Sequence, residues 1–545
     1  MRNRVRNLLA LALCLAVLLS GCGGIDVVGF LGALGEVTGA VEGSPSDKAP
    51  FGDRVIPFEE MEYTRPDLEE MQSLLENVRQ ASSEEDLDGV LDGIYDLYDA
   101  FDWFYTAYNL ADIGYSSDLT SAYWEGEYQY CAAASGQVDG MLEQMYRILA
   151  DSPLADTLEG EDYFGKGFFD AYRGESIYSD EFLALLEEES GLVSRYYQLS
   201  GEEPDSEDGY DSWWQETAQV LVDLIRVRQR EAQCQGYDSY VDFAYDFYYD
   251  RDYAPEDAET YLAEIRDSLT PLYRDGMSYD VWEAAARYTS EEKTFAYLRA
   301  AAENMGGTVL DAFRLMEQGE LYDISYSENK YNSSFEVYLT SYGEPFLFMN
   351  PERSGYDCLT IAHEFGHFCN DYASYGSVAG IDVAEFFSQG MEYLSLCYGS
   401  DTQDLARAKL ADSLSTYVEQ GCYALFEQEM YRLTDEELSP ERLRTLYEET
   451  ALDFGFDSVG YDPGEFVSIT HFYTNPMYVI SYVVSNDAAM QLYILERDES
   501  GGGLSCLEKH LDTEESFFLA FLESAGLESP FHRIQTVKNF FEKNL

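Results

Sequence analysis

The chain has 545 residues, with 33 Lys or Arg against 104 Asp or Glu and a formal net charge of −71. A surface this acidic repels nucleic acid and anionic membranes, so nucleic acid is excluded as a partner. The charge also attracts cations and basic peptides, but adaptation to salty surroundings would explain it equally well. Charge alone therefore does not identify a substrate.

The N-terminal residues have the pattern of a bacterial lipoprotein signal. Three arginines lie within the first six residues, an apolar stretch too short to span a membrane covers 8–19, and Cys22 follows. We expect residues 1–21 to be a signal peptide, Cys22 to carry the lipid and 22–55 to be a flexible tether. An ordinary secretory peptide with an incidental cysteine is the alternative. On the first interpretation the protein is held at the cell membrane by its lipid only and faces outside the cytoplasm.

Residues 56–300 are expected to form an acidic helical lobe. Apolar residues recur at helical spacing in several segments of this lobe, such as 67–80, 86–111 and 213–234. Strand signals are few in the chain. The clearest are 335–339 and 345–349, which lie shortly before the next motif.

Residues 363–367 read His-Glu-Phe-Gly-His, and the apolar residues before them place this HExxH pattern on a helix. His363 and His367 are one turn apart, so both imidazoles project from one face and can take two corners of a tetrahedral zinc ion. Glu364 is the candidate general base, because a carboxylate next to a ligand can reach a zinc-bound water without binding the metal. The pattern predicts one zinc ion per chain. The alternative is a surface helix that contains the HExxH pattern by chance and binds no metal.

The third zinc ligand is expected from a second helix over 382–394. A catalytic zinc ion has three protein ligands and an open water position, so one more ligand is needed. Glu385 and Glu392 are seven residues apart, close to two turns, and share a face of that helix. One can bind zinc while the other orients a ligand imidazole. The spacing leaves open which glutamate does which.

Two patterns around these helices resemble the thimet oligopeptidase and oligoendopeptidase F family of zinc metallopeptidases. They are Pro-Phe-Leu-Phe-Met-Asn at 345–350 and Glu-x-x-Ser-Gln-x-x-Glu from Glu385 to Glu392. In that family the first glutamate of the second pattern binds zinc, which is Glu385 by position. The 17 residues between His367 and Glu385 are fewer than the family's usual gap, and the 24 before Glu392 suit that gap better. The resemblance implies Glu385 as the ligand and keeps Glu392 as the orienting residue or the alternative ligand.

A later segment, 471–482, is similar to the histidine-and-tyrosine segment with which the family holds the substrate carbonyl. Asn475-Pro476 is typical of an N-cap and the first turn of a helix, on which Tyr478 and Tyr482 would project together. His471 and a phenol could donate hydrogen bonds to the oxyanion that forms during peptide hydrolysis. Aromatic packing is the alternative role for each tyrosine, because the chain has 46 of them.

These patterns predict a mainly α fold, a large two-lobed helical body around a deep substrate cleft with a small β element next to the HExxH helix. The predicted catalytic region is 301–545. The expected function is an extracytoplasmic zinc metalloendopeptidase, an oligopeptidase that hydrolyses short unfolded peptides with Glu364 as the base. A peptide-binding lipoprotein with a non-catalytic zinc site and a zinc exopeptidase are the alternatives. An intact HExxH favours an enzyme, because a binding module has no use for Glu364.

Overall fold

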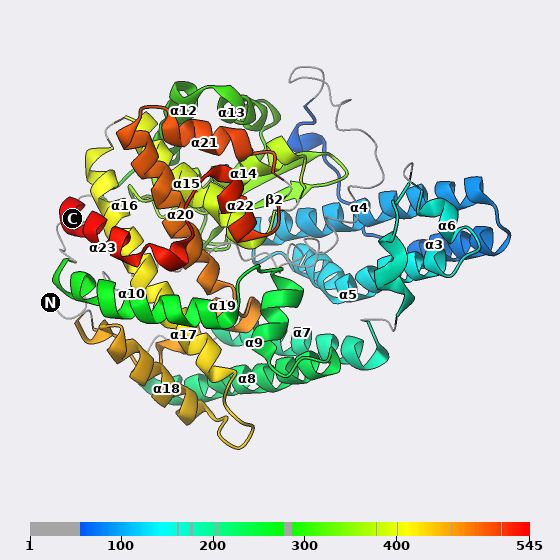
Figure 1. Cartoon of the computed structure of the whole chain (residues 1–545), viewed down its shortest axis with the longest axis horizontal. Coiled ribbons are helices and arrows are strands. Elements are labelled where there is room, and N and C mark those ends of the chain that lie inside the picture. The colour runs from blue at the N-terminus through cyan, green and yellow to red at the C-terminus, as the bar shows by residue number, and fades with distance from the viewer. Residues whose placement is uncertain are drawn as a thin grey trace.

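The computed structural model describes residues 55–160, 163–174, 178–201, 204, 207–276, 286–377, 379–400, 402–458, 460–513 and 515–545. The predicted signal peptide, the predicted lipidation site Cys22 and nearly all of the predicted tether lie outside these residues. Within the described ranges, no helix is both long enough and apolar enough to cross a membrane. Helices make up most of this part of the chain (Figure 1).

Three helices from the first part of the chain form a bundle that projects from the rest of the molecule (Figure 1). They are α3 (Leu68–Ser83), α4 (Leu87–Ser117) and α5 (Ala122–Ala150). Each helix is preceded by an N-cap residue whose side chain accepts hydrogen bonds from backbone N–H groups of the first turn. The N-cap residues are Asp67, Asp86 and Ser121 respectively. The apolar faces of the three helices enclose a core of their own. The short helices α6 (Ala155–Leu158) and η3 (Phe168–Arg173) pack against α5.

The remaining helices build a larger body, and its described residues form one large core and a smaller apolar cluster. In chain order the α-helices are α7 (Asp180–Gly201), α8 (Glu207–Cys234), α9 (Tyr240–Phe243), α10 (Pro255–Gly276), α12 (Glu291–Met305), α13 (Gly307–Gly319), α14 (Asp357–Ser374), α15 (Ile381–Tyr398), α16 (Gln403–Ser415), α17 (Gly421–Met430), α18 (Pro440–Asp453), α19 (Thr470–Thr474), α20 (Val479–Asp498), α21 (Gly502–His510), α22 (Phe518–Ala525) and α23 (Ile534–Asn544). Short 3-10 or π turns lie at η2 (Phe58–Glu60), η4 (Ala244–Tyr248), η5 (Thr416–Gln420), η6 (Phe456–Ser458), η7 (Glu465–Ser468) and η8 (Pro530–His532).

Helices α14, α15 and α20 lie at the centre of this body (Figure 1). Helices α15 and α20 are buried on all sides over most of their length, so their polar side chains need partners inside the protein. Asn486 of α20 is one example, since it accepts a hydrogen bond from Ser413 Oγ at 2.9 Å and donates one to Ser413 O at 3.1 Å. Such bonds fix the position of α20 relative to its neighbours.

A three-stranded sheet packs beside α14. Its strands are β1 (Tyr322–Asp323), β2 (Ser334–Leu339) and β3 (Glu344–Met349), in the order β1-β3-β2. The central strand β3 is buried throughout and pairs antiparallel with β2, with Phe335 opposite Phe348. The mainly α fold with a small β element next to the HExxH helix, as predicted from the sequence, is confirmed. Residue 300 lies within α12, and the predicted division into domains stays a prediction.

Candidate metal centre

The HExxH pattern lies on α14, and the pattern that contains Glu385 lies on α15, which packs against it. One possible ligand atom from each of His363, His367 and Glu385 lies within 4.8 Å of the other two. A tetrahedral ion with bonds of about 2.0 to 2.1 Å keeps its ligand atoms roughly 3.4 Å apart. The distance from His363 Nε2 to Glu385 Oε2 is 3.5 Å, close to that spacing. His363 Nε2 is buried and has no hydrogen-bond partner within the described part of the chain. The three residues therefore fit a zinc ion.

Gly366, the fourth residue of the HExxH pattern, allows this approach of the two helices. A Cβ added there would lie 2.5 Å from both Phe387 O and Ser388 Cα on α15. Both atoms belong to backbone, so neither could move aside by a side-chain rotation. The glycine brings the histidines of α14 close enough to α15 for Glu385 to join them.

Two hydroxyl groups hold the Glu385 carboxylate in place. Tyr478 OH donates to Oε1 at 2.7 Å and Ser388 Oγ donates to Oε2 at 3.0 Å. Glu385 itself is fully buried, and burial raises the pKa of its carboxyl group. Hydrogen bonds of this kind reduce the rotation of a ligand and so pre-organise it for a metal.

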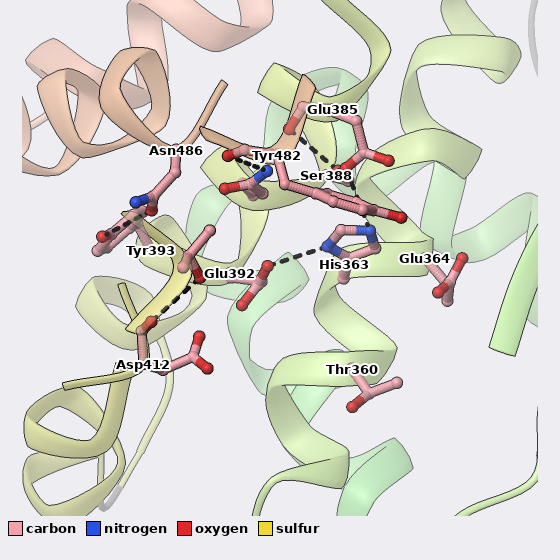
Figure 2. Close-up of polar contacts among 12 residues, drawn as sticks. Thr360, His363, Glu364, Glu385, Ser388, Glu392, Tyr393, Asp412, Tyr482 and Asn486 are labelled. Atoms are coloured by element: carbon pink, nitrogen blue, oxygen red, sulfur yellow. Dashed lines mark hydrogen bonds and ion pairs between the residues drawn. The ribbon is translucent and has the colours of Figure 1, made fainter. Parts of the chain in front are cut away.

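Glu392 lies on the other side of the His363 ring (Figure 2). Its Oε1 is 2.9 Å from His363 Nδ1, and its Oε2 is 2.7 Å from the ammonium group of Lys409. Burial alone would raise the pKa of Glu392, but Lys409 and the bond to His363 outweigh it and lower the pKa overall. An anionic Glu392 accepts the Nδ1–H of His363, which leaves Nε2 facing His367 and Glu385. In the structure Glu385 thus lies next to His363 Nε2, and Glu392 contacts the opposite nitrogen of the same ring. The ligand assignment itself stays a prediction.

Glu364 is buried on the side of His363 opposite Glu392 (Figure 2). Ser334 Oγ, at the start of the edge strand β2, donates to Glu364 Oε1 at 2.7 Å. The other oxygen, Oε2, has no hydrogen-bond partner within the described ranges. Burial raises the pKa of Glu364 to about 7 despite the opposing effect of His363. A carboxyl group of this pKa can both accept and return a proton near neutral pH.

The structure brings His471, Tyr478 and Tyr482 together beside α15. The His471 ring stacks on Tyr478 with 5.0 Å between centroids, and Tyr482 OH is 3.3 Å from His471 Nε2. The predicted helix start at Asn475-Pro476 is wrong, because α20 begins at Val479 with Tyr478 as its N-cap. The reason is Met477, whose φ of 68° cannot continue a right-handed helix.

Residues from the first half of the chain hold this segment. Arg228 of α8 is fully buried and donates to Phe472 O at 2.8 Å and Tyr473 O at 2.5 Å. These carbonyl groups are at the end of α19, the short helix that carries His471. Arg251 donates to Ser481 Oγ of α20 at 2.8 Å. The position of the aromatic cluster therefore depends on residues far away in the sequence.

Comparison with protein families gives two matches along the chain. Residues 58–175 match the Peptidase M3 N-terminal domain, and residues 307–530 match Peptidase family M3. The two domains belong to one family and together cover more than half of the chain. The chain belongs to peptidase family M3. Members of this family are metallopeptidases, so the protein is a peptidase, and the residues 363–367 and 385 lie inside the second match.

Solved structures similar to this M3 peptidase share its fold. A protein assigned as oligoendopeptidase F from Bacillus anthracis is 20% identical, with a TM-score of 0.74 over 90% of this chain and 98% of the other. PZ peptidase A, solved with an inhibitor, is 20% identical, with a TM-score of 0.73 over 89% of this chain and 99% of the other. Oligoendopeptidase F from Enterococcus faecium is 15% identical, with a TM-score of 0.55 over 87% and 97%. No curated protein sequence matches the chain.

Several residues that support this M3 site are not among the predicted site residues. Ser334 and Lys409 each contact a glutamate more than 15 positions away, so no local pattern connects them. One signal for Lys409 was present. It lies among the apolar residues of Ala408-Lys409-Leu410-Ala411, in a chain with few basic residues, which is typical of a buried lysine with an acidic partner.

Proposed function

We propose that this M3 peptidase is a zinc endopeptidase that hydrolyses short, unfolded peptides outside the cytoplasm. The observation that supports it most strongly is the cluster of His363, His367 and Glu385 ligand atoms with a buried glutamate beside it. His363 and His367 would hold zinc through their imidazoles and Glu385 through a carboxylate oxygen. Zinc, when bound there, would polarise the scissile carbonyl group and lower the pKa of water. The names of the similar structures, oligoendopeptidase F, favour short peptides as substrates.

In this proposal Glu364 transfers the proton. Its Oε1 is fixed by Ser334, while Oε2 is available to accept a proton from the attacking water and then give it to the leaving amine. The same carboxyl group serves both steps, and its burial, which raises its pKa, favours uptake of the proton. Replacing this one group would therefore stop both halves of the reaction.

We propose that His471 and Tyr482 stabilise the negative charge on the substrate oxygen. Tyr482 OH and His471 Nε2 lie 3.3 Å apart, so the two groups form one hydrogen-bonding unit beside the ligand cluster. Tyr478 OH donates to Glu385 Oε1, so in this proposal its phenol supports the predicted zinc ligand. Donors directed at the developing oxyanion lower the reaction barrier more than they stabilise the bound substrate.

Cleavage mapping tests the proposed reaction. The zinc-loaded protein would be incubated with a mixed peptide library, and the products would be read by mass spectrometry. We expect internal cuts in short peptides, and loss of these cuts for Glu364→Gln prepared in the same way, which excludes a contaminating protease. Cuts confined to the peptide termini would show an exopeptidase, and equal cutting by Glu364→Gln would reject the mechanism.

Metal analysis of two matched variants tests the ligands. Glu385→Gln and Glu392→Gln change glutamates on the same face of α15, and both side chains are fully buried. We expect Glu385→Gln to lose zinc, and Glu392→Gln to keep one zinc ion per chain with lower affinity. Full zinc in Glu385→Gln with none in Glu392→Gln would reverse the assignment.

The location is proposed from the sequence of residues 1–22. A lipid on Cys22 would hold the enzyme at the outer face of the cell membrane, where it would act on extracellular peptides. Cys22→Ser should prevent lipidation and release the protein from the membrane fraction. Unchanged fractionation, with no lipid on wild-type Cys22, would instead indicate an ordinary secreted enzyme.

A further inference from the structure

Lys409 of α16 lies in the interior, directly behind the metal centre. Its side chain is 1% exposed, and its ammonium nitrogen is 2.7 Å from Glu392 Oε2 and 3.2 Å from Asp412 Oδ2. The nitrogen also lies 5.3 Å from the ring centroid of Tyr393. Burial of an ammonium group costs several kcal/mol in general unless anionic partners compensate it. Glu392 and Asp412 supply such anionic partners.

The contacts form a chain from Asp412 to the predicted ligand. Asp412 and Lys409 are three residues apart on α16, so they share one face and the aspartate limits rotation of the ammonium group. Lys409 holds Glu392 Oε2, and Glu392 Oε1 accepts from His363 Nδ1 at 2.9 Å. The opposite atom of that ring, Nε2, is 3.5 Å from Glu385 Oε2. The four residues therefore connect α16 to the ligand atoms.

Lys409 acts on the predicted metal centre from behind the ligands. Its side chain is 1% exposed, and its ammonium group faces the carboxylates of Glu392 and Asp412. The cavity that it lines is also lined by His363 and Glu392. Its contacts therefore connect it to the predicted ligand through Glu392.

We propose that Lys409, anchored by Asp412, is a positioning residue of the metal centre. It balances the charge of Glu392 and fixes its carboxylate as the acceptor for His363 Nδ1–H, so that Nε2 points toward His367 and Glu385. Without the ammonium group, the buried Glu392 carboxylate loses its only lysine or arginine partner among the described residues and no longer fixes the imidazole. This inference rests on the proposed zinc site.

Zinc affinity of the full-length protein, measured by competition with a chelator at fixed pH, tests this role. Lys409→Met should raise the zinc Kd by about 10- to 100-fold, the usual effect of losing the support of a ligating histidine. Lys409→Arg, which keeps the charge, should stay within about threefold of wild type. Substitution of cobalt for zinc gives a second readout, because a reoriented His363 would change the visible absorption of the bound ion.

Lys330 provides a matched control. It is also a buried lysine, 4% exposed, but its ammonium group bonds Asp323 and backbone carbonyls and contacts none of the ligands. Lys330→Met should lower the melting temperature of the metal-free protein while the zinc Kd stays within about twofold of wild type. A wild-type zinc Kd in Lys409→Met would overturn the inference, and so would an equal loss in Lys409→Arg, which would indicate packing rather than charge.

Two further measurements keep the outcomes separate. If Lys409→Met does not fold, Asp412→Asn decides, with an expected rise in zinc Kd of about threefold or more and an unchanged Kd counting against the inference. The proposed zinc site itself fails if wild type and His363→Ala bind zinc equally. The positioning role alone fails if wild type binds one zinc ion, His363→Ala binds none, and the Lys409 variants bind as wild type does.

Discussion

Replacement of Gly366 by alanine should separate the two helices that carry the predicted zinc ligands. The added methyl group would lie 2.5 Å from two backbone atoms of α15, Phe387 O and Ser388 Cα, where ordinary contact begins at 3.4 Å. The helices would have to move apart by about 1 Å, because backbone cannot rotate out of the way. Overpacking of this kind costs typically about 1 to 3 kcal/mol of folding stability.

The same movement carries Glu385 away from the histidines. Metal sites tolerate deviations of roughly 0.2 Å in ligand distance, so a shift near 1 Å exceeds what the ligand set can absorb. We expect Gly366→Ala to raise the zinc Kd by at least about tenfold and to lower the melting temperature of the metal-free protein by a few degrees. Chelator competition measures the first effect, and thermal unfolding followed by circular dichroism measures the second.

Gly126→Ala provides the control for the effect of adding a methyl group to a helix. Gly126 lies inside α5, and no atom lies within 4 Å of the place where its Cβ would be. Alanine should stabilise the helix there by roughly 0.5 to 1 kcal/mol and leave zinc binding unchanged. The reasoning is refuted if Gly366→Ala keeps both the zinc Kd and the melting temperature of wild type.

Four further variants test the general base, the aromatic cluster and a buried acid. Glu364→Gln should retain zinc and lower peptide hydrolysis at least about a hundredfold, so near-normal turnover in a zinc-replete sample would contradict its role as base. Tyr482→Phe should raise the activation barrier by about 2.7 to 4 kcal/mol, which lowers kcat with little change in KM. Tyr478→Phe loses the bond to Glu385 and should also weaken zinc binding, whereas melting changes with normal kinetics would indicate packing for both tyrosines. Burial raises the pKa of Glu427 to about 8, so its contribution to stability is full below about 4.5 and is lost as pH rises through 8. Glu427→Gln should therefore gain melting temperature relative to wild type between pH 5 and 8, and parallel pH curves would contradict this.

The parts of the site that the sequence predicted are those with short-range spacing. His363 and His367 are one turn apart on one helix, and Glu385 and Glu392 are two turns apart on the next, so helical geometry alone fixes which side chains share a face. The short gap between His367 and Glu385 has a local explanation. Helix α14 ends at Ser374 and α15 begins at Ile381, with Tyr375 in the left-handed conformation to end the first helix. A short connection between two packed helices is enough to bring Glu385 to the histidines.

The start of α20 shows where a local signal fails. Asn475-Pro476 has the residue types of a helix start, but the backbone at Met477 adopts a φ of 68° and the helix begins after it. A methionine reaches this conformation only at a cost, which its surroundings must offset. Glu427 accepts a hydrogen bond from the Met477 N–H, and Tyr249 OH donates to Pro476 O at 2.8 Å. Both partners come from distant parts of the chain, so nothing near residue 477 could indicate them.

The buried basic side chains also make contacts that no local sequence pattern indicates, and these contacts surround the whole candidate site. Lys409, Arg228 and Arg251 are buried in a chain that has only 33 basic residues, and each contacts a carboxylate, a carbonyl or a hydroxyl of the central helices or of α19. A buried charge is costly unless its partners are in place, so these contacts exist only when helices from both halves of the chain have packed correctly. Helical spacing and the family resemblance predict the candidate ligands, but the orientation of these side chains depends on the long-range contacts. We therefore expect substitutions at Lys409 or Arg228 to impair the site without changing a residue of the HExxH pattern.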